Sequence, residues 1–98
     1  MNINKIPEGE KLTVSIGGRL DTTTAPELEK ELKESYDGIN ELVLDLSALD
    51  YISSAGLRVL LSAQKSMAAK GGMIVTGANA DIMEIFEVTG FTDILDIQ

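Results

Sequence analysis

The sequence predicts a single α/β domain over residues 1–98, with a mixed, mostly parallel sheet of four to five strands and three to four helices. Three observations carry this prediction. The nearly continuous apolar run of residues 42–46 suits a strand that is covered on both faces. Residues 57–68 repeat apolar side chains every three or four positions, as an amphipathic helix does. Strand and helix patterns alternate along most of the chain, which is typical of a sheet with crossover helices.

Two strands are expected before the first helix. Isoleucines within residues 3–6, followed by the Pro-Glu-Gly turn of residues 7–9, indicate a short strand paired with the next one. Residues 11–16 alternate polar and apolar side chains and predict a half-buried strand. We expect the glycines at positions 17–18 to end this strand and to place Asp21 at its carboxyl end.

The first helix is expected to start at residues 24–27, because Thr-Ala-Pro-Glu has capping-box spacing and confines proline to the first turn. It ends near residues 37–38. Its apolar stripe consists of Ala25, Leu28, Leu32 and Tyr36.

The central segment predicts a strand over residues 42–46, a loop over 47–52 and a helix opened by Ser53 and Ser54. Lysine followed by two glycines at positions 70–72 marks the end of this helix. A capping serine stabilises a helix by about 0.5–2 kcal/mol relative to alanine. The same position is also where a phosphate group is accommodated, since the helix dipole and free amides point toward it.

The C-terminal third predicts a short buried strand over residues 73–75 that leads to Thr76 and Gly77. Asn79 is expected to cap a further helix that ends before Gly90. Residues 94–97 form a last strand or an apolar tail. The inward side chains of this last helix are Ile82, Ile85 and Phe86.

Polar side chains follow several of the expected parallel strands. Because right-handed crossovers bring the carboxyl ends of such strands to one edge, we expect Asp21, Asp45, the serine pair 53–54 and residues 76–77 to meet there. Open α/β sheets place their sites at this edge. Each aspartate has two interpretations: a cap or loop acceptor of amide protons, or a functional carboxylate. Arg58 is expected in solvent or at the rim of a partner's contact.

The composition limits the classes of function. Sixteen acidic against eight basic residues give a formal charge of −8, which argues against direct nucleic-acid binding because the phosphate backbone would be repelled. The acidic surface suits a basic partner, or serves solubility alone. Cysteine is absent, so disulfides and thiolate metal sites are excluded. Residues 1–5 lack the apolar core of a signal peptide and no run approaches the ~20 residues that span a bilayer, so we expect a cytoplasmic protein without membrane insertion.

An enzyme is not expected. A nucleophilic serine needs a base, histidine is absent, and Lys65 and Lys70 lie well along the helix from Ser54. Two acids at one edge make a poor magnesium site, and no glycine-rich nucleotide loop is present. We therefore expect no catalytic residue, metal or cofactor.

Three groups of residues carry a family resemblance: Gly-Arg-Leu-Asp at 18–21, Leu-Asp-Leu-Ser at 44–47 with Ile-Ser-Ser-Ala-Gly-Leu at 52–57, and Gly-Phe at 90–91. Together they span nearly all of the chain and resemble the STAS domain family, in particular the stand-alone anti-sigma factor antagonists of bacteria. The family's usual central pattern is Asp-Ser-(Ser/Thr)-Gly. The match places the family's phosphorylated serine at Ser54, with Ser53 where the acid is common and Ala55 where a second hydroxyl is common.

This resemblance implies a function by partner switching. The unmodified chain would bind an anti-sigma factor that is also a serine kinase and so release the sigma factor. Phosphorylation of Ser54 would end that binding, and a phosphatase would reset it. The partner-binding residues implied are Asp21, Asp45, Ser53, Ser54, Ala55, Gly56 and Arg58.

Two other functions stay open. The chain could be a STAS regulatory subunit of a membrane transport or lipid-trafficking complex, docking through the same surface without phosphorylation. A more distant alternative is a binder of a small ligand or nucleotide.

Overall fold

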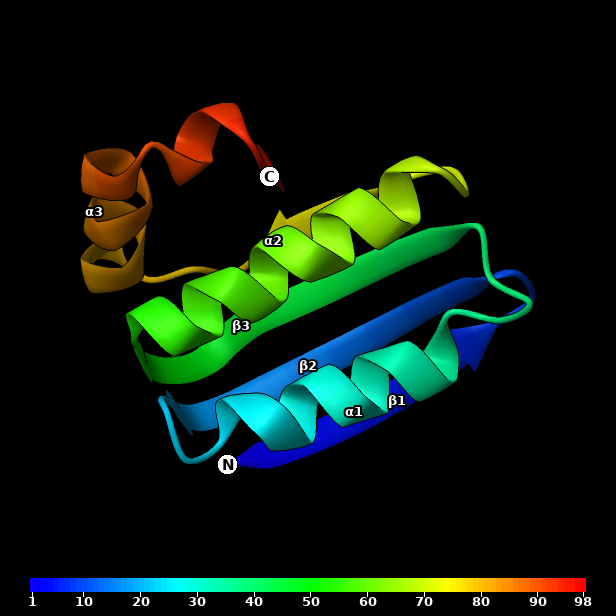
Figure 1. Cartoon of the computed structure of the whole chain (residues 1–98), viewed down its shortest axis with the longest axis horizontal. Helices are drawn as coiled ribbons and strands as arrows, with labels where there is room; N and C mark the ends of the chain where they lie inside the picture. Colours follow the sequence, from blue (N-terminus) through cyan, green and yellow to red (C-terminus); the bar gives the residue numbers. More distant parts are fainter.

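A five-stranded sheet runs through the computed structural model, which describes all residues from 1 to 98 (Figure 1). The strand order is β1-β2-β3-β4-β5, with β1 antiparallel to β2 and the other neighbours parallel. The predicted α/β class and the mixed, mostly parallel sheet are confirmed. The elements are β1 (Asn2–Glu8), β2 (Lys11–Leu20), α1 (Ala25–Ser35), β3 (Glu41–Ile52), α2 (Ser54–Ala68), β4 (Met73–Thr76), α3 (Ala80–Thr89), the 3₁₀ helix η1 (Phe91–Asp93) and β5 (Asp96–Ile97).

Helices α1 and α2 lie side by side on one face of the sheet (Figure 1). This follows from the strand order, because right-handed crossovers in a sheet that grows in one direction place successive helices on the same side. On the opposite face Val43, Asp45 and Ile74 are only half-buried. The prediction that residues 42–46 are covered on both faces is therefore wrong, since only the leucines at 42, 44 and 46 reach the core.

Strands β2 and β3 are both longer than predicted. Residues 17–18 lie inside β2 rather than ending it, and residues 47–52 continue β3 rather than forming a loop. The pairing shifts twice, so that Ser15 faces Asp45 while Leu20 faces Ile52. Each shift leaves one extra residue on β3, which is a β-bulge. Because of the bulges, the buried side chains Leu46, Leu49 and Ile52 are three residues apart. The alternation of buried and exposed residues that identifies a strand in a sequence is therefore absent here.

Two of the three predicted helix caps are confirmed. Ser53 precedes α2 and its Oγ accepts a hydrogen bond from the amide of Gly56 (3.4 Å). Asn79 precedes α3 and its Oδ1 accepts from the amide of Ile82 (2.9 Å), while Gly90 ends that helix in the left-handed conformation. Thr24 precedes α1 but makes no side-chain cap, so the capping-box prediction is wrong.

The core fills the space between the sheet and the helices. It consists of 22 buried hydrophobic residues and contains no buried polar or charged one. Leu44 of β3 and Leu60 of α2 are completely buried within it, as the periodicity predicts. None of the helices is long and apolar enough to cross a bilayer.

Substitutions at two adjacent leucines of α2 test which residues form the core. Leu60 is fully buried and Leu61 is half-buried, so Leu60→Ala should lower the free energy of unfolding by about 2–5 kcal/mol and Leu61→Ala by clearly less. Chemical denaturation of both variants measures this difference. Equal losses for the two leucines would contradict the orientation of α2 on the sheet.

Candidate functional site

The turn between β3 and α2 holds the two serines in different environments. The amide of Ser53 donates to the carbonyl of Leu20 (2.9 Å), so the end of β3 is tied to the end of β2. Ser53 is half-buried and uses its hydroxyl oxygen as the cap of α2. Ser54, the first residue of α2, is exposed. The cap role therefore belongs to Ser53, and the hydroxyl of Ser54 stays available to another molecule.

Gly56 allows the first turn of α2 to pack directly against the strands. A Cβ atom at this position would lie 2.7 Å from Cγ of Leu20 and 2.8 Å from Cγ1 of Ile52, closer than packed carbon atoms approach. Both of these side chains are buried in the core, so neither has free space to move into. Gly56 thus acts through packing, and it fixes where Ser54 stands above the ends of β2 and β3.

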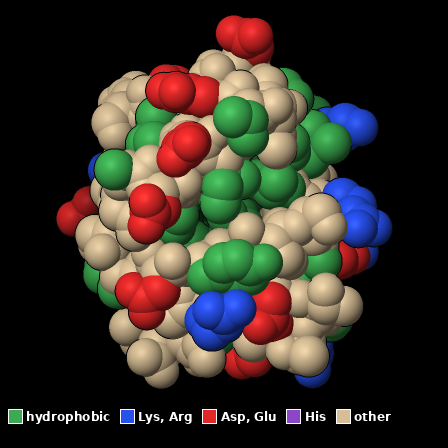
Figure 2. Space-filling model, turned by 90° about the vertical axis from the view of Figure 1, so that its left-hand side faces the viewer, with side chains coloured by type: hydrophobic (Ala, Val, Ile, Leu, Met, Phe, Trp, Pro, Cys, Tyr) green, Lys and Arg blue, Asp and Glu red, His purple; other side chains and the backbone are tan.

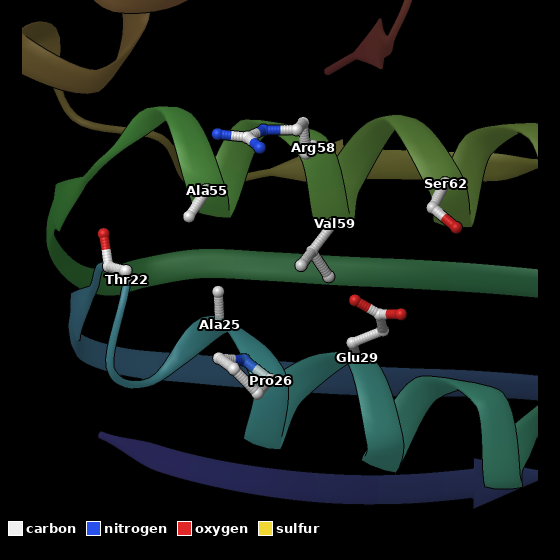
Figure 3. Close-up of a pocket in the computed structure, with 8 residues that line it drawn as sticks. All are labelled: Thr22, Ala25, Pro26, Glu29, Ala55, Arg58, Val59 and Ser62. Carbon is white, nitrogen blue, oxygen red and sulfur yellow. The ribbon is translucent and has the colours of Figure 1, made fainter.

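A groove between α1 and α2 lies beside this turn (Figure 3). Its apolar lining comes from both helices, and Thr22 and Ser62 complete it. Arg58 is exposed, forms no ion pair, and extends along α2 toward the N-terminal end of that helix (Figure 3). Glu29, on the α1 side, pairs with Lys33 (2.8 Å). The apolar lining residues are Ala25, Pro26, Ala55 and Val59.

Asp21 follows β2 directly and organises the turn into α1. Its Oδ1 accepts hydrogen bonds from the hydroxyl of Thr23 (2.7 Å), the amide of Thr23 (3.0 Å) and the amide of Thr24 (3.2 Å). The Thr23 hydroxyl is the main reason why the pKa of Asp21 lies below its ordinary value. Thr24 instead donates its hydroxyl to the carbonyl of Arg19 (2.8 Å). The Thr24 hydroxyl also accepts from the amide of Asp21 (2.9 Å), so it is engaged within the turn and does not cap α1, which explains that error.

Asp45 lies in the middle of β3, on the open face of the sheet. Its carboxylate accepts from the amide of Ser47 (3.0 Å) and from the hydroxyl of Ser15 (3.3 Å). The Ser47 amide is the main cause of a pKa below the ordinary value of 3.8. Gly77 adopts a φ of 76°, and a Cβ atom there would lie 2.9 Å from Oδ1 of Asp45. The structure thus favours the loop-acceptor interpretation of Asp45.

The predicted single edge is in fact two separate places, and that prediction is wrong. Asp45 faces Thr76 in the sheet, whereas Ile52 at the end of β3 faces Leu20. Ile52 lies seven positions after Asp45 on β3, which corresponds to about 20 Å of strand. Asp21 and the Ser53–Ser54 turn therefore stand together, and Asp45 with residues 76–77 stands apart. The cause is that β2 and β3 extend well beyond the end of β4.

Beside the Ser53–Ser54 turn lies a pair that the sequence did not single out. The guanidinium carbon of Arg19 lies 4.2 Å from the centre of the Tyr51 ring, which is cation–π geometry. The two residues face each other across β2 and β3. Only the two bulges bring them opposite each other, so no simple spacing rule finds the pair. Figure 2 views this end of the molecule and shows more acidic than basic side chains there.

Comparison with known proteins places these residues in a family. The model of the STAS domain family matches residues 2–98. A putative anti-sigma factor antagonist, BtrV of Bordetella bronchiseptica, is 38% identical over 88% of this chain and 76% of its own length. The anti-sigma-B factor antagonist of Listeria monocytogenes is 32% identical over 100% of this chain and 90% of its own length.

Solved structures agree with this result. The crystal structure of an anti-sigma factor antagonist from Mycobacterium paratuberculosis superimposes with a TM-score of 0.89 at 25% identity, covering 98% of this chain and 83% of that one. The unphosphorylated form of the anti-sigma factor antagonist SpoIIAA has a TM-score of 0.77 at 12% identity over 99% of this chain and 87% of that one, and it shows the fold alone.

The acid sensitivity of the fold tests the role assigned to Asp45. Its folded pKa is lowered, so its hydrogen bonds contribute fully above pH 3.8 and are lost as the pH falls through the folded value. Asp45→Asn keeps an acceptor oxygen but has no proton to gain, so the acid-induced loss of stability below about pH 4 should be smaller than in the parent.

Denaturation midpoints between about pH 5 and pH 2 measure this effect. The exposed Asp50, which receives no hydrogen bond, supplies the matched control, because Asp50→Asn changes the net charge equally. If both variants change the denaturation midpoints at low pH by the same amount, the effect comes from net charge and not from the contacts of Asp45.

Proposed function

Since the chain belongs to the STAS domain family, we propose that it is an anti-sigma factor antagonist whose partner-binding surface centres on Ser54. The observation that carries the proposal is the exposure of Ser54 at the start of a helix whose cap, Ser53, is a different residue. The hydroxyl of Ser54 is therefore free for a partner to contact and for a kinase to modify. Relatives named anti-sigma factor antagonists support the same function.

Phosphorylation of Ser54 would act as an electrostatic switch. A phosphoryl group adds about −1.5 to −2 charge at neutral pH. The first turn of α2 tolerates that charge, because helix amides and the helix dipole favour anions there. Arg58 follows one turn later, and residues four apart on a helix have Cβ atoms about 5–6 Å apart. The fold should thus be kept while the surface that meets the partner becomes more negative.

The remaining proposed contacts surround Ser54. Ala55 and Arg58 line the groove between α1 and α2, which offers an apolar floor to a partner's side chain. Asp21 stands at the end of the neighbouring strand. Asp45 is not part of the proposed contact surface, because about 20 Å of strand separates it from the turn.

The partners that fit this proposal are an anti-sigma factor with serine kinase activity and a phosphatase that removes the group again. Both would act in the cytoplasm, and the chain would bind no nucleic acid itself. The chain is not proposed to be an enzyme, because the hydroxyl of Ser54 has no histidine anywhere in the sequence to serve as its base.

The site of modification is the first test. Ser54, and not Ser53, should receive phosphate from the cognate kinase and Mg-ATP, because Ser53 is half-buried and occupied as the helix cap. To identify the kinase, a tagged Ser54→Ala chain is expressed in its own cells, and the proteins that co-purify with it are identified. Mass spectrometry of the parent, Ser53→Ala and Ser54→Ala chains then locates the phosphate. Full labelling of Ser54→Ala would refute the assignment, and recovery of transport proteins instead of a kinase would favour the regulatory-subunit function.

The effect on binding is the second test. Phosphorylation should weaken the anti-sigma factor complex at least ~10-fold, about 1.4 kcal/mol, while the thermal melting curve changes little. Ser54→Asp should reproduce part of this loss, because it has less charge and fewer oxygens. Titration calorimetry with the three forms measures it. Parent-like affinity of Ser54→Asp together with unweakened binding of the phosphorylated chain would rule out a charge switch.

A further inference from the structure

Arg19 and Tyr51 form an exposed pair next to the Ser53–Ser54 turn. The side chain of Arg19 is 64% exposed and Tyr51 is 38% exposed. They occupy the position in the sheet directly before Leu20 and Ile52, and the carbonyl of Leu20 accepts from the amide of Ser53. The pair therefore borders the proposed docking surface and does not belong to the core.

Arg19 donates no side-chain hydrogen bond in this structure. It forms an ion pair with Asp21, in which its Nε lies 3.8 Å from Oδ2, too far for a hydrogen bond. A guanidinium carries five N–H donors whose fork matches a carboxylate. Stacking on the Tyr51 ring holds the guanidinium plane in place, so less side-chain entropy is lost when a ligand binds. This arrangement is suited to bidentate recognition of a carboxylate.

Tyr51 stands out among the exposed apolar side chains. Only four large ones are exposed: Ile6, Tyr51, Val88 and Ile94. Ile6 belongs to β1, Val88 to the end of α3 and Ile94 to the segment after η1, so Tyr51 alone lies at the β3–α2 turn. Tyrosine and arginine are the side chains over-represented among the residues that dominate interface energies. An adjoining, preorganised pair of them indicates an anchor for a protein partner.

The distribution of charge shows what kind of group this anchor meets. The chain has two arginines, Arg19 and Arg58, and both flank the turn, whereas all six lysines lie elsewhere. Among the charged side chains of this end, acidic ones outnumber basic ones (Figure 2). On a face of mainly one sign, a single opposite charge fixes the register of a complementary partner. The partner that fits presents a carboxylate opposite Arg19.

We propose that Arg19 and Tyr51 form a partner-specificity site that binds one aspartate or glutamate side chain of the anti-sigma factor. The guanidinium of Arg19 donates two hydrogen bonds to that carboxylate, and the Tyr51 ring packs against the aliphatic part of the same partner segment. The proposal rests on the function proposed above, and it adds the group on the partner that is recognised.

The test uses the anti-sigma factor retained by the Ser54→Ala chain, purified and titrated with full-length variants. Arg19→Glu should weaken binding at least about 30-fold, as expected for a residue that dominates an interface. Arg19→Lys keeps the charge but loses the fork and should fall in between, and Tyr51→Ala should lose about tenfold. Lys65→Glu is the matched control: it makes the same change of net charge on an exposed side chain in the last turn of α2, and should stay within about twofold of the parent. Melting curves confirm that each variant is folded.

The carboxylate itself is located by replacing acidic surface residues of the anti-sigma factor one at a time with lysine. One replacement should weaken the parent complex and restore binding of Arg19→Glu. If Arg19→Glu binds like Lys65→Glu while the parent binds tightly, the specificity site is refuted and the proposed function stands. If the folded parent binds no anti-sigma factor, the proposed function and the specificity site are both refuted.

Discussion

The contact of Gly56 with Leu20 and Ile52 is the constraint on which the rest of the site depends. It brings the first turn of α2 onto the ends of β2 and β3 at a distance that no larger residue allows. Ser53 then reaches the carbonyl of Leu20 and caps the helix, and Ser54 is left outside. The same contact requires Leu20 and Ile52 to point into the core, so their neighbours Arg19 and Tyr51 must point out of it. One close approach thus orients both the serine and the arginine–tyrosine pair.

The parts of the fold that local physics decides could be predicted from the sequence. The stripes of α1 and α2, the caps Ser53 and Asn79 and the glycine end of α3 involve residues within four positions of each other, and all are present. Thr24 is the exception that shows the limit. Its spacing fits a capping box, yet its hydroxyl is engaged in the preceding turn, where it accepts from the amide of Asp21 (2.9 Å) and donates to the carbonyl of Arg19 (2.8 Å).

The parts that depend on pairing between distant strands could not be predicted. Nothing local marks the bulges of β3, which space Leu46, Leu49 and Ile52 three apart and make a strand resemble a loop. The bulges affect the prediction of the site in two ways. A strand without them does not place Arg19 opposite Tyr51, and a strand that ends at residue 46 places Asp45 beside the serines, from which the length of β3 separates it. The serine at the helix start was found because the signal for a cap lies within the helix itself.

The net charge of −8 describes the whole chain, whereas the electrostatics of this site depend on the charges close to the turn. Charges farther apart than the screening length of about 8 Å at physiological ionic strength contribute little to one another, so only the charged groups near the turn act on it strongly. The two arginines are the cations that flank it. A phosphoryl group on Ser54, one helical turn from Arg58, would exceed that cation's charge and make the surroundings of the turn more acidic. A switch of this kind works through the negative charge added at the contact, and it needs no movement of the backbone.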